Sequence, residues 1–243
     1  MSTTLAEWFA TPTGRYLLER EQAWFDRTVA DIFGFHAIQI GLPEVPFLAQ
    51  SRIATRWTVD DAPPAQLIAD PHWLPFGENA LDLIVLPHAL EFSADPHQLL
   101  REAYRTVRPE GQVLVAGFNP FSLYGGKRYF GRGQTPPWNG SFIALYRLKD
   151  WLALLGFEVT AGSLDCYAPP FAQEHWLRRF SFFERAGDRW WPIAGGVYFL
   201  RATKKILGMR IITPAWERKK PRLAPAARQA RECIERTESQ TAE

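Results

Sequence analysis

The segment Ile68–Pro120 restricts the fold of this chain most strongly, because two short apolar runs flank one amphipathic stretch. The runs are Leu81–Leu86, which Pro87 closes, and Gln112–Gly117. Apolar runs of about four to eight residues between turn residues are typical of strands that are buried on both faces of a sheet.

The stretch between these runs has the start, the face and the end of a helix. Asp95 offers an N-cap side chain and Pro96 suits the first helical position. Pro109 and Gly111 end the helix. One apolar face repeats at helical spacing through Leu99, Leu100, Ala103, Tyr104 and Val107. A strand, a helix and a second strand predict a βαβ unit with parallel strands and a right-handed crossover.

Size and composition describe a globular chain that forms either one large domain or a domain with an appendage. The 243 residues are 47% apolar and 22% charged, and no apolar run is long enough to span a membrane. The N-terminal residues lack the pattern of a secretory signal, so we expect a cytoplasmic protein without a transmembrane segment. Cys166 and Cys233 lie far apart, which predicts neither a disulfide framework nor a metal site. A net charge of +2 predicts no sequence-specific nucleic acid partner.

The segment Ile68–Pro120 resembles the central part of the class I S-adenosylmethionine-dependent methyltransferases, most closely their small-molecule type 11 branch. The resemblance rests on Asp70, Leu74–Phe76, Leu81–Val85, Leu90–Phe92, Arg101–Glu102 and Arg105–Gly111. It implies an α/β, Rossmann-like, seven-stranded and mostly parallel sheet with an antiparallel last strand and helices on both faces. It also implies S-adenosyl-L-methionine as the cofactor and a small molecule as the substrate.

Three parts are expected along the chain. Residues 1–35 form an N-terminal arm, extended over residues 1–14, and a helix at Arg15–Phe33 that either walls the substrate site or covers the sheet. Residues 36–203 form the methyltransferase-like domain, with an aromatic-rich insertion at 162–196 that includes a helix at Glu174–Arg185. The insertion could cap a substrate pocket, form a homodimer contact or meet a membrane surface. Residues 204–243 form a basic, partly disordered tail.

The expected strands place a crevice between the first and the fourth of them. His36–Leu42 is the first strand, and a short helix at Glu44–Gln50 leads to the second strand at Arg56–Val59. Too few residues then remain for a linking helix, so the third strand, Gln66–Ala69, follows directly at a sheet edge. Ligands of open α/β sheets bind beyond the carboxyl ends of the strands, where the strand order reverses.

The turn after the first strand departs from the family pattern, which is an acidic residue followed by three alternating glycines. Gln39 stands in place of the acid, and only Gly41 remains of the glycines. Pro43 and Val45 follow it. Gly41 is therefore the cofactor-binding residue expected from this turn. The departure also supports an alternative, a catalytically inactive methyltransferase-like binding or scaffold protein with a degenerate cofactor loop.

Two carboxylates are candidates for binding the nucleoside. Asp60, or Asp61 beside it, falls where an acid binds ribose hydroxyls, although Asp is also a common turn residue in such a sequence. The resemblance implies that Asp70 reaches the adenine amino group. Trp73 or His72 could then lie beside the adenine ring, and Trp73 could instead pack in the core.

The fourth strand should bring Leu86, Pro87 and His88 to the same crevice as Gly41. His88 is a weak candidate for a catalytic base, since an imidazole titrates near neutrality, and a structural hydrogen bond is the alternative. Glu91 is expected to cap or orient the loop that follows.

The long connection Phe121–Gly140 has no apolar period and is predicted to be a loop. Its Tyr124, Lys127 and Arg128 are candidates for binding an anionic or aromatic substrate, and a solvated loop with anchoring aromatics is the alternative. The resulting hypothesis is an S-adenosylmethionine-dependent methyltransferase that methylates a small molecule by in-line displacement. A nicotinamide enzyme is disfavoured, because the three-glycine fingerprint is missing.

Overall fold

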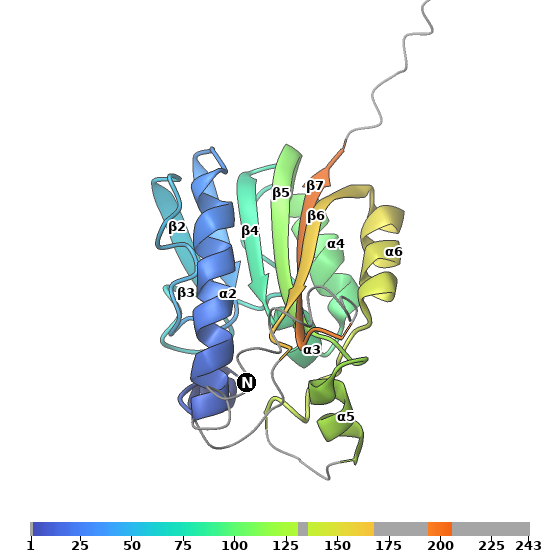
Figure 1. Cartoon of the computed structure of the whole chain (residues 1–243). Coiled ribbons are helices and arrows are strands. Elements are labelled where there is room, and N and C mark those ends of the chain that lie inside the picture. Colours follow the sequence, from blue (N-terminus) through green and yellow to red (C-terminus); the bar gives the residue numbers. More distant parts are fainter. Residues whose placement is uncertain (1, 131–135, 168–193, 206–243) are drawn as a thin grey trace, which may run out of the picture. The chain divides into compact units, whose positions relative to one another are not determined.

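A seven-stranded sheet organises the described residues, which are 2–130, 136–167 and 194–205 of this computed structural model (Figure 1). Its strands are β1 (His36–Ile40), β2 (Thr55–Asp60), β3 (Leu67–Ile68), β4 (Leu81–Pro87), β5 (Val107–Phe118), β6 (Phe157–Asp165) and β7 (Val197–Lys204). The strand order is β3-β2-β1-β4-β5-β7-β6. The strands from β3 to β5 pair in parallel, and β7 is antiparallel to β5 and β6.

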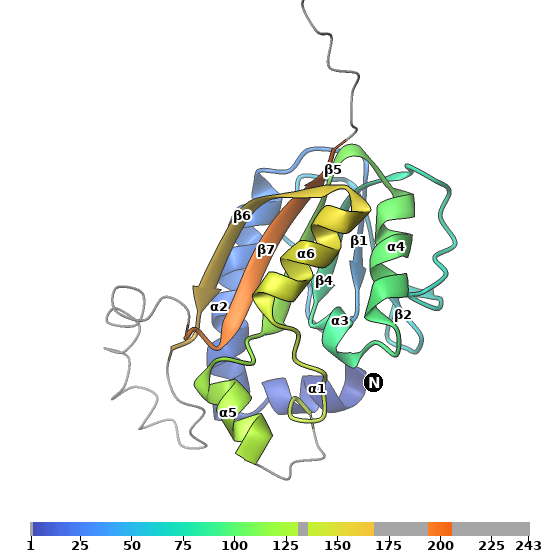
Figure 2. The ribbon, with the colours of Figure 1, turned by 90° about the vertical axis from the view of Figure 1, so that its right-hand side faces the viewer.

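Helices cover both faces of this sheet. They are α1 (Ser2–Phe9), α2 (Pro12–Ala30), α3 (Ala89–Phe92), α4 (Pro96–Thr106), α5 (Leu123–Phe130) and α6 (Leu145–Leu155). α2 packs on one face, and α4 and α6 pack on the other (Figure 1). α1, α3 and α5 lie at the end of the sheet where the parallel strands finish (Figure 2). The predicted fold class is confirmed, including the reversal of strand order between β1 and β4.

Strand periodicity divides the apolar residues into two core layers. In β4, Ile84 and Leu86 join the layer under α4 and α6, whereas Leu83 and Val85 join the layer under α1 and α2. Every residue of β4 is buried. A strand covered on both faces needs no polar side, which explains the apolar run Leu83–Pro87. The one charged residue of β4, Asp82, accepts hydrogen bonds from the Phe35 and His36 N–H groups.

The helix predicted between β4 and β5 begins as expected. Asp95 Oδ1 accepts a hydrogen bond from the Gln98 N–H at 3.0 Å, and Pro96 is the first residue of α4. The short link between β2 and β3, which is described throughout, contains no helix, as predicted.

The N-terminal arm was predicted wrongly, because its described residues, 2–14, are not extended. α1 occupies Ser2–Phe9, and α2 begins before Arg15. The Thr11 side chain accepts a hydrogen bond from the Gly14 N–H at 3.1 Å, and Pro12 takes the first helical position. A capping Thr followed by Pro is a helix-start signal that the apolar pattern alone does not reveal.

Two further local predictions are wrong. Glu44–Gln50 forms turns rather than a helix. The loop predicted after β5 contains α5, whose first turn is capped by Ser122 Oγ, an acceptor for the Gly125 N–H at 3.2 Å. Two adjacent glycines, poor helix formers, conceal α5 in the sequence.

Some predictions fall on parts of the chain that are not described. The expected helix at Glu174–Arg185 and nearly all of the basic tail at 204–243 lie outside the described residues. β6 extends to Asp165, so the first residues of the predicted insertion belong to the sheet. Among the residues that are described, no helix is long and apolar enough to cross a membrane.

Candidate functional site

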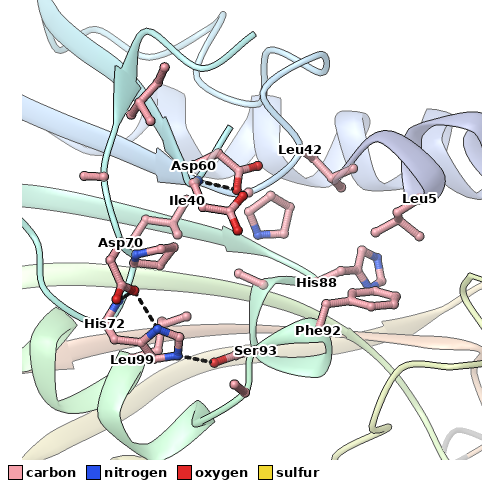
Figure 3. A pocket seen from close by; sticks show the side chains of 18 residues that line it. Leu5, Ile40, Leu42, Asp60, Asp70, His72, His88, Phe92, Ser93 and Leu99 are labelled. Carbon is pink, nitrogen blue, oxygen red and sulfur yellow. Dashed lines mark hydrogen bonds and ion pairs between the residues drawn. The ribbon is translucent and has the colours of Figure 1, made fainter. Parts of the chain in front are cut away.

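A cavity of about 510 Å³ opens at the carboxyl ends of β1, β2, β3 and β4. Five residues predicted to bind the cofactor line it, namely Gly41, Asp60, Asp70, Pro87 and His88. Asp70, His72 and Ser93 gather at one end of the cavity, and Leu5, Leu42, His88 and Phe92 gather at the other (Figure 3). The reversal of strand order between β1 and β4 produces this opening, since the connections that follow these two strands diverge to opposite faces.

The turn after β1 is held by Gln39, the residue that replaces the expected acid. Its buried amide Nε2 donates to the carbonyl oxygens of Gly41 at 3.1 Å, Leu42 at 2.8 Å and Val45 at 2.8 Å. Its Oε1 accepts from the Phe47 N–H at 3.0 Å. A carboxylate has no proton to donate to a carbonyl, so an amide is the side chain that fits here. Gln39 therefore organises a turn of different construction from the three-glycine loop.

The cavity stays open beside this turn. Gly41 has φ +85, a conformation that side chains rarely adopt. Val45 packs into the core layer on the α2 face, and neither Pro43 nor Val45 is among the residues that line the cavity.

The two acids at the end of β2 both reach the cavity. Asp60 is buried, and its Oδ1 accepts from the Asp61 N–H at 2.9 Å, whereas Asp61 is exposed. Because it is buried, the Asp60 side chain is held in one position on the cavity wall. Asp60 is therefore the better candidate of the two for binding ribose hydroxyls.

Asp70 begins a chain of hydrogen bonds at the other acidic part of the wall. Its Oδ1 accepts from the His72 N–H at 2.8 Å and lies 2.7 Å from His72 Nδ1 (Figure 3). These bonds to the carboxylate lower the pKa of Asp70 below its usual range. His72 Nε2 lies 2.8 Å from Ser93 Oγ.

His88 sits in the left-handed conformation directly after β4 and is completely enclosed. Its Nε2 is 2.7 Å from Glu21 Oε1, and its Nδ1 is 2.8 Å from Glu91 Oε2. Burial alone would lower the pKa of His88, but the two carboxylates outweigh burial and raise it to about 10. Burial raises the pKa of Glu91, whose other oxygen accepts from the Phe118 N–H.

An imidazolium with both N–H groups engaged has no lone pair with which to take a proton. The geometry of His88 therefore favours the structural alternative over a catalytic base. Glu21 was not expected in this site. The sequence signal that could have identified Glu21 is a charged residue on the buried face of a helix, between Leu17 and Phe25.

Other candidates from the sequence lie away from this cavity. Leu86 is buried in the core and does not line the cavity. Trp73 does not line the cavity either, and because its side chain is 69% exposed it does not pack in the core. The expected substrate residues of α5 contact aromatic rings instead. Lys127 Nζ lies 4.8 Å from the centre of the Trp138 ring, Arg128 lies over Phe142, and Tyr124 is buried.

The charges that line the cavity are mostly negative. Asp60, Asp61 and Asp70 are on its wall, and no Lys or Arg of the described residues is. Across the same described residues, no group of three or more His, Cys, Asp or Glu side chains is arranged to hold a metal ion. The wall therefore suits a neutral or cationic organic ligand.

Comparisons with known proteins agree with this geometry. The family profile described as "Methyltransferase domain" matches residues 48–115, which begin after the Gly41 turn. The chain is 30% identical over 233 residues to the uncharacterized protein YafS of Escherichia coli, covering 93% of this chain and 92% of YafS.

Solved structures give the same fold at low sequence identity. A possible histamine N-methyltransferase of Thermotoga maritima has a TM-score of 0.58 at 18% identity, covering 78% of this chain and 93% of that one. A SAM-dependent methyltransferase of Archaeoglobus fulgidus has a TM-score of 0.55 at 19% identity, covering 77% and 94%. The chain therefore belongs with YafS to one sequence family, which has the class I S-adenosylmethionine-dependent methyltransferase fold and a match to the methyltransferase-domain profile at residues 48–115.

Proposed function

We propose that this protein binds S-adenosyl-L-methionine and transfers its methyl group to a small molecule. The observation that carries the proposal is the open cavity where the strand order reverses, with Gly41, Asp60 and Asp70 on its wall. Ligands of open α/β sheets bind at this position.

The residues present fit such a ligand. The positive φ of Gly41 leaves the backbone uncovered, so an extended ligand can approach it closely. Asp60, at the end of β2 and on the cavity wall, would accept hydrogen bonds from the ribose hydroxyls. Both hydrogen bonds to Asp70 use Oδ1, and its side chain is 57% exposed, so Oδ2 can accept from an adenine amino group. The acidic wall complements a ligand that carries a sulfonium and an ammonium group.

The sulfonium makes the methyl group electrophilic when the cofactor is bound. The chain then has to hold an acceptor in line and exclude water, and such placement lowers the barrier by several kcal/mol, up to about 10 kcal/mol. Leu5, Leu42 and Phe92 wall the His88 end of the cavity and suit the apolar part of a small acceptor (Figure 3). His88 orients this wall rather than accepting a proton, because Glu21 and Glu91 occupy both of its nitrogens.

Titration calorimetry with S-adenosylmethionine and S-adenosylhomocysteine tests the proposal directly. We expect saturable heat with both ligands, and we expect Gly41→Trp, which adds a large side chain to the cavity wall, to abolish it. No heat with either ligand at millimolar concentration defeats the proposal. An inactive binding or scaffold protein would then account for the fold, as the departures at Gln39 and Pro43 first suggested.

A further inference from the structure

Three side chains at one end of the cavity form a hydrogen-bonded series, and the proposed methyl transfer uses only Asp70 of the three, through its other carboxylate oxygen. Ser93 Oγ lies 2.8 Å from His72 Nε2, and His72 Nδ1 lies 2.7 Å from Asp70 Oδ1 (Figure 3). All three residues line the cavity. A hydroxyl, an imidazole and a carboxylate in this sequence of contacts is the arrangement by which serine nucleophiles are activated on unrelated folds.

The partners determine where the protons lie. The Asp70 carboxylate, whose pKa is below its usual range, only accepts hydrogen bonds, so His72 Nδ1 carries a proton and donates it. With the proton on Nδ1, the lone pair of the imidazole lies on Nε2. The Ser93 hydroxyl donates to that lone pair, and this is the direction in which His72 can remove its proton.

Neighbouring contacts hold this geometry. Asp70 Oδ1 also accepts from the His72 N–H at 2.8 Å, which fixes the imidazole relative to its carboxylate. Gln98 Nε2 of α4 donates to the His72 carbonyl at 3.3 Å. Ser93 directly follows α3 and is only half-buried, so its oxygen is accessible from the cavity.

We propose that Ser93 is an activated nucleophile, with His72 as its base and Asp70 orienting His72, and that this end of the cavity accepts carboxylic esters. Ser93 Oγ attacks the ester carbonyl while its proton moves to His72 Nε2. The carbon–oxygen bond to the alcohol breaks, and the alcohol leaves with that proton. Water then attacks the acyl-serine, again giving a proton to His72, and the acid leaves as Ser93 regains its proton.

The walls select the type of ester. The apolar residues Leu99 and Ile68 line the same cavity as His72 and Ser93. The acids on the wall disfavour an anionic substrate. A neutral ester with a small apolar acyl group is therefore the expected class.

Labelling the full-length protein with a fluorophosphonate probe tests the proposal. Such a probe forms a bond from phosphorus to an activated serine oxygen and loses fluoride. We expect peptide mass spectrometry to find the adduct on Ser93 and hydrolysis of p-nitrophenyl acetate to accompany it. Ser93→Ala removes the adduct, and His72→Ala slows its formation by about 100-fold or more. Asp70→Asn also slows it, because an amide can donate to Nδ1 and shift the imidazole proton to Nε2.

Ser122 supplies the matched control. Its hydroxyl is buried and donates to the Asn119 carbonyl at 2.6 Å, so Ser122→Ala should leave labelling unchanged. The proposal is overturned if the wild-type protein shows no adduct on Ser93 under conditions that label a known serine hydrolase. It is equally overturned if His72→Ala labels at the wild-type rate. Neither outcome depends on whether the protein binds S-adenosylmethionine.

Discussion

Glu21 of α2 and His88 at the end of β4 are joined by a fully buried hydrogen bond of 2.7 Å between Oε1 and Nε2. The pair connects the N-terminal helix to the cavity wall, because His88 also lines the cavity. Glu91 engages the other imidazole nitrogen, so three ionisable groups share one enclosed space. α2 thereby contacts the site through His88, although none of its own residues lines the cavity.

Replacement of Glu21 by Ala should destabilise the fold by about 3 kcal/mol, because it removes one partner of a buried charged pair. Urea unfolding monitored by circular dichroism measures this change. Glu19→Ala is the matched control, since Glu19 is exposed on the same helix, and we expect it to change stability by less than about 0.5 kcal/mol. Equal stability of the two variants would show that the Glu21–His88 contact contributes nothing.

The stability of the protein should decrease as the pH rises above neutrality. His88 has a pKa of about 10 in the fold against 6.5 for an unperturbed imidazole, so the native state retains a proton that the unfolded chain releases. This stabilisation is complete below about pH 6.5 and is lost as the pH rises towards 10, at up to about 1.4 kcal/mol per pH unit. The raised pKa of Glu91 acts in the same direction.

Urea unfolding between about pH 6.5 and pH 9.5 checks this dependence. The variant His88→Gln keeps a side chain that can hydrogen-bond but cannot be charged, so its stability should vary less steeply with pH. If both proteins gave the same slope, His88 would not be the group responsible.

Gly41→Val should weaken binding of S-adenosylhomocysteine by tenfold or more. The positive φ of Gly41 strains any β-branched residue, and a Cβ there would lie 3.6 Å from the Ala89 side chain on the cavity wall. Gly77→Ala is the control, because a Cβ added to Gly77 meets nothing within 4 Å. Titration calorimetry measures the affinity of both variants for S-adenosylhomocysteine, and thermal melts verify that both are folded. Unchanged affinity in Gly41→Val would remove this turn from the binding site.

The two acids at the end of β2 should differ in their effect on binding. Asp60 is buried on the wall and Asp61 is exposed, so Asp60→Ala should lower affinity for S-adenosylhomocysteine more than Asp61→Ala does. Loss of a charge-assisted hydrogen bond of about 1.5–3 kcal/mol corresponds to roughly 10- to 100-fold. A larger loss in Asp61→Ala would assign the ribose to Asp61 instead.

The fold could be predicted where local patterns agree with the tertiary structure. β4, the start of α4 and the second half of β5 follow from apolar runs and an Asp-Pro helix start within one continuous segment. The predicted helix stop is wrong, because α4 ends at Thr106 and both Pro109 and Gly111 lie inside β5. The predictions failed at the start of α2 and at α5, where Thr11 and Ser122 cap the first turn, and they also missed α1.

The sequence by itself determined the order of the strands, the buried strand β4 and the end of the sheet at which a site would form, because the strands are recognised from residues close together in the chain. Only the tertiary structure decided that Glu21 meets His88, and that His72 meets Ser93. The tertiary structure also shows that Gln39, which departs from the family pattern in the sequence, holds the Gly41 turn through its side-chain amide. A hydrogen bond requires two atoms within about 3 Å, and for residues far apart in the chain that separation is set by the packing of whole elements rather than by either residue's own neighbours.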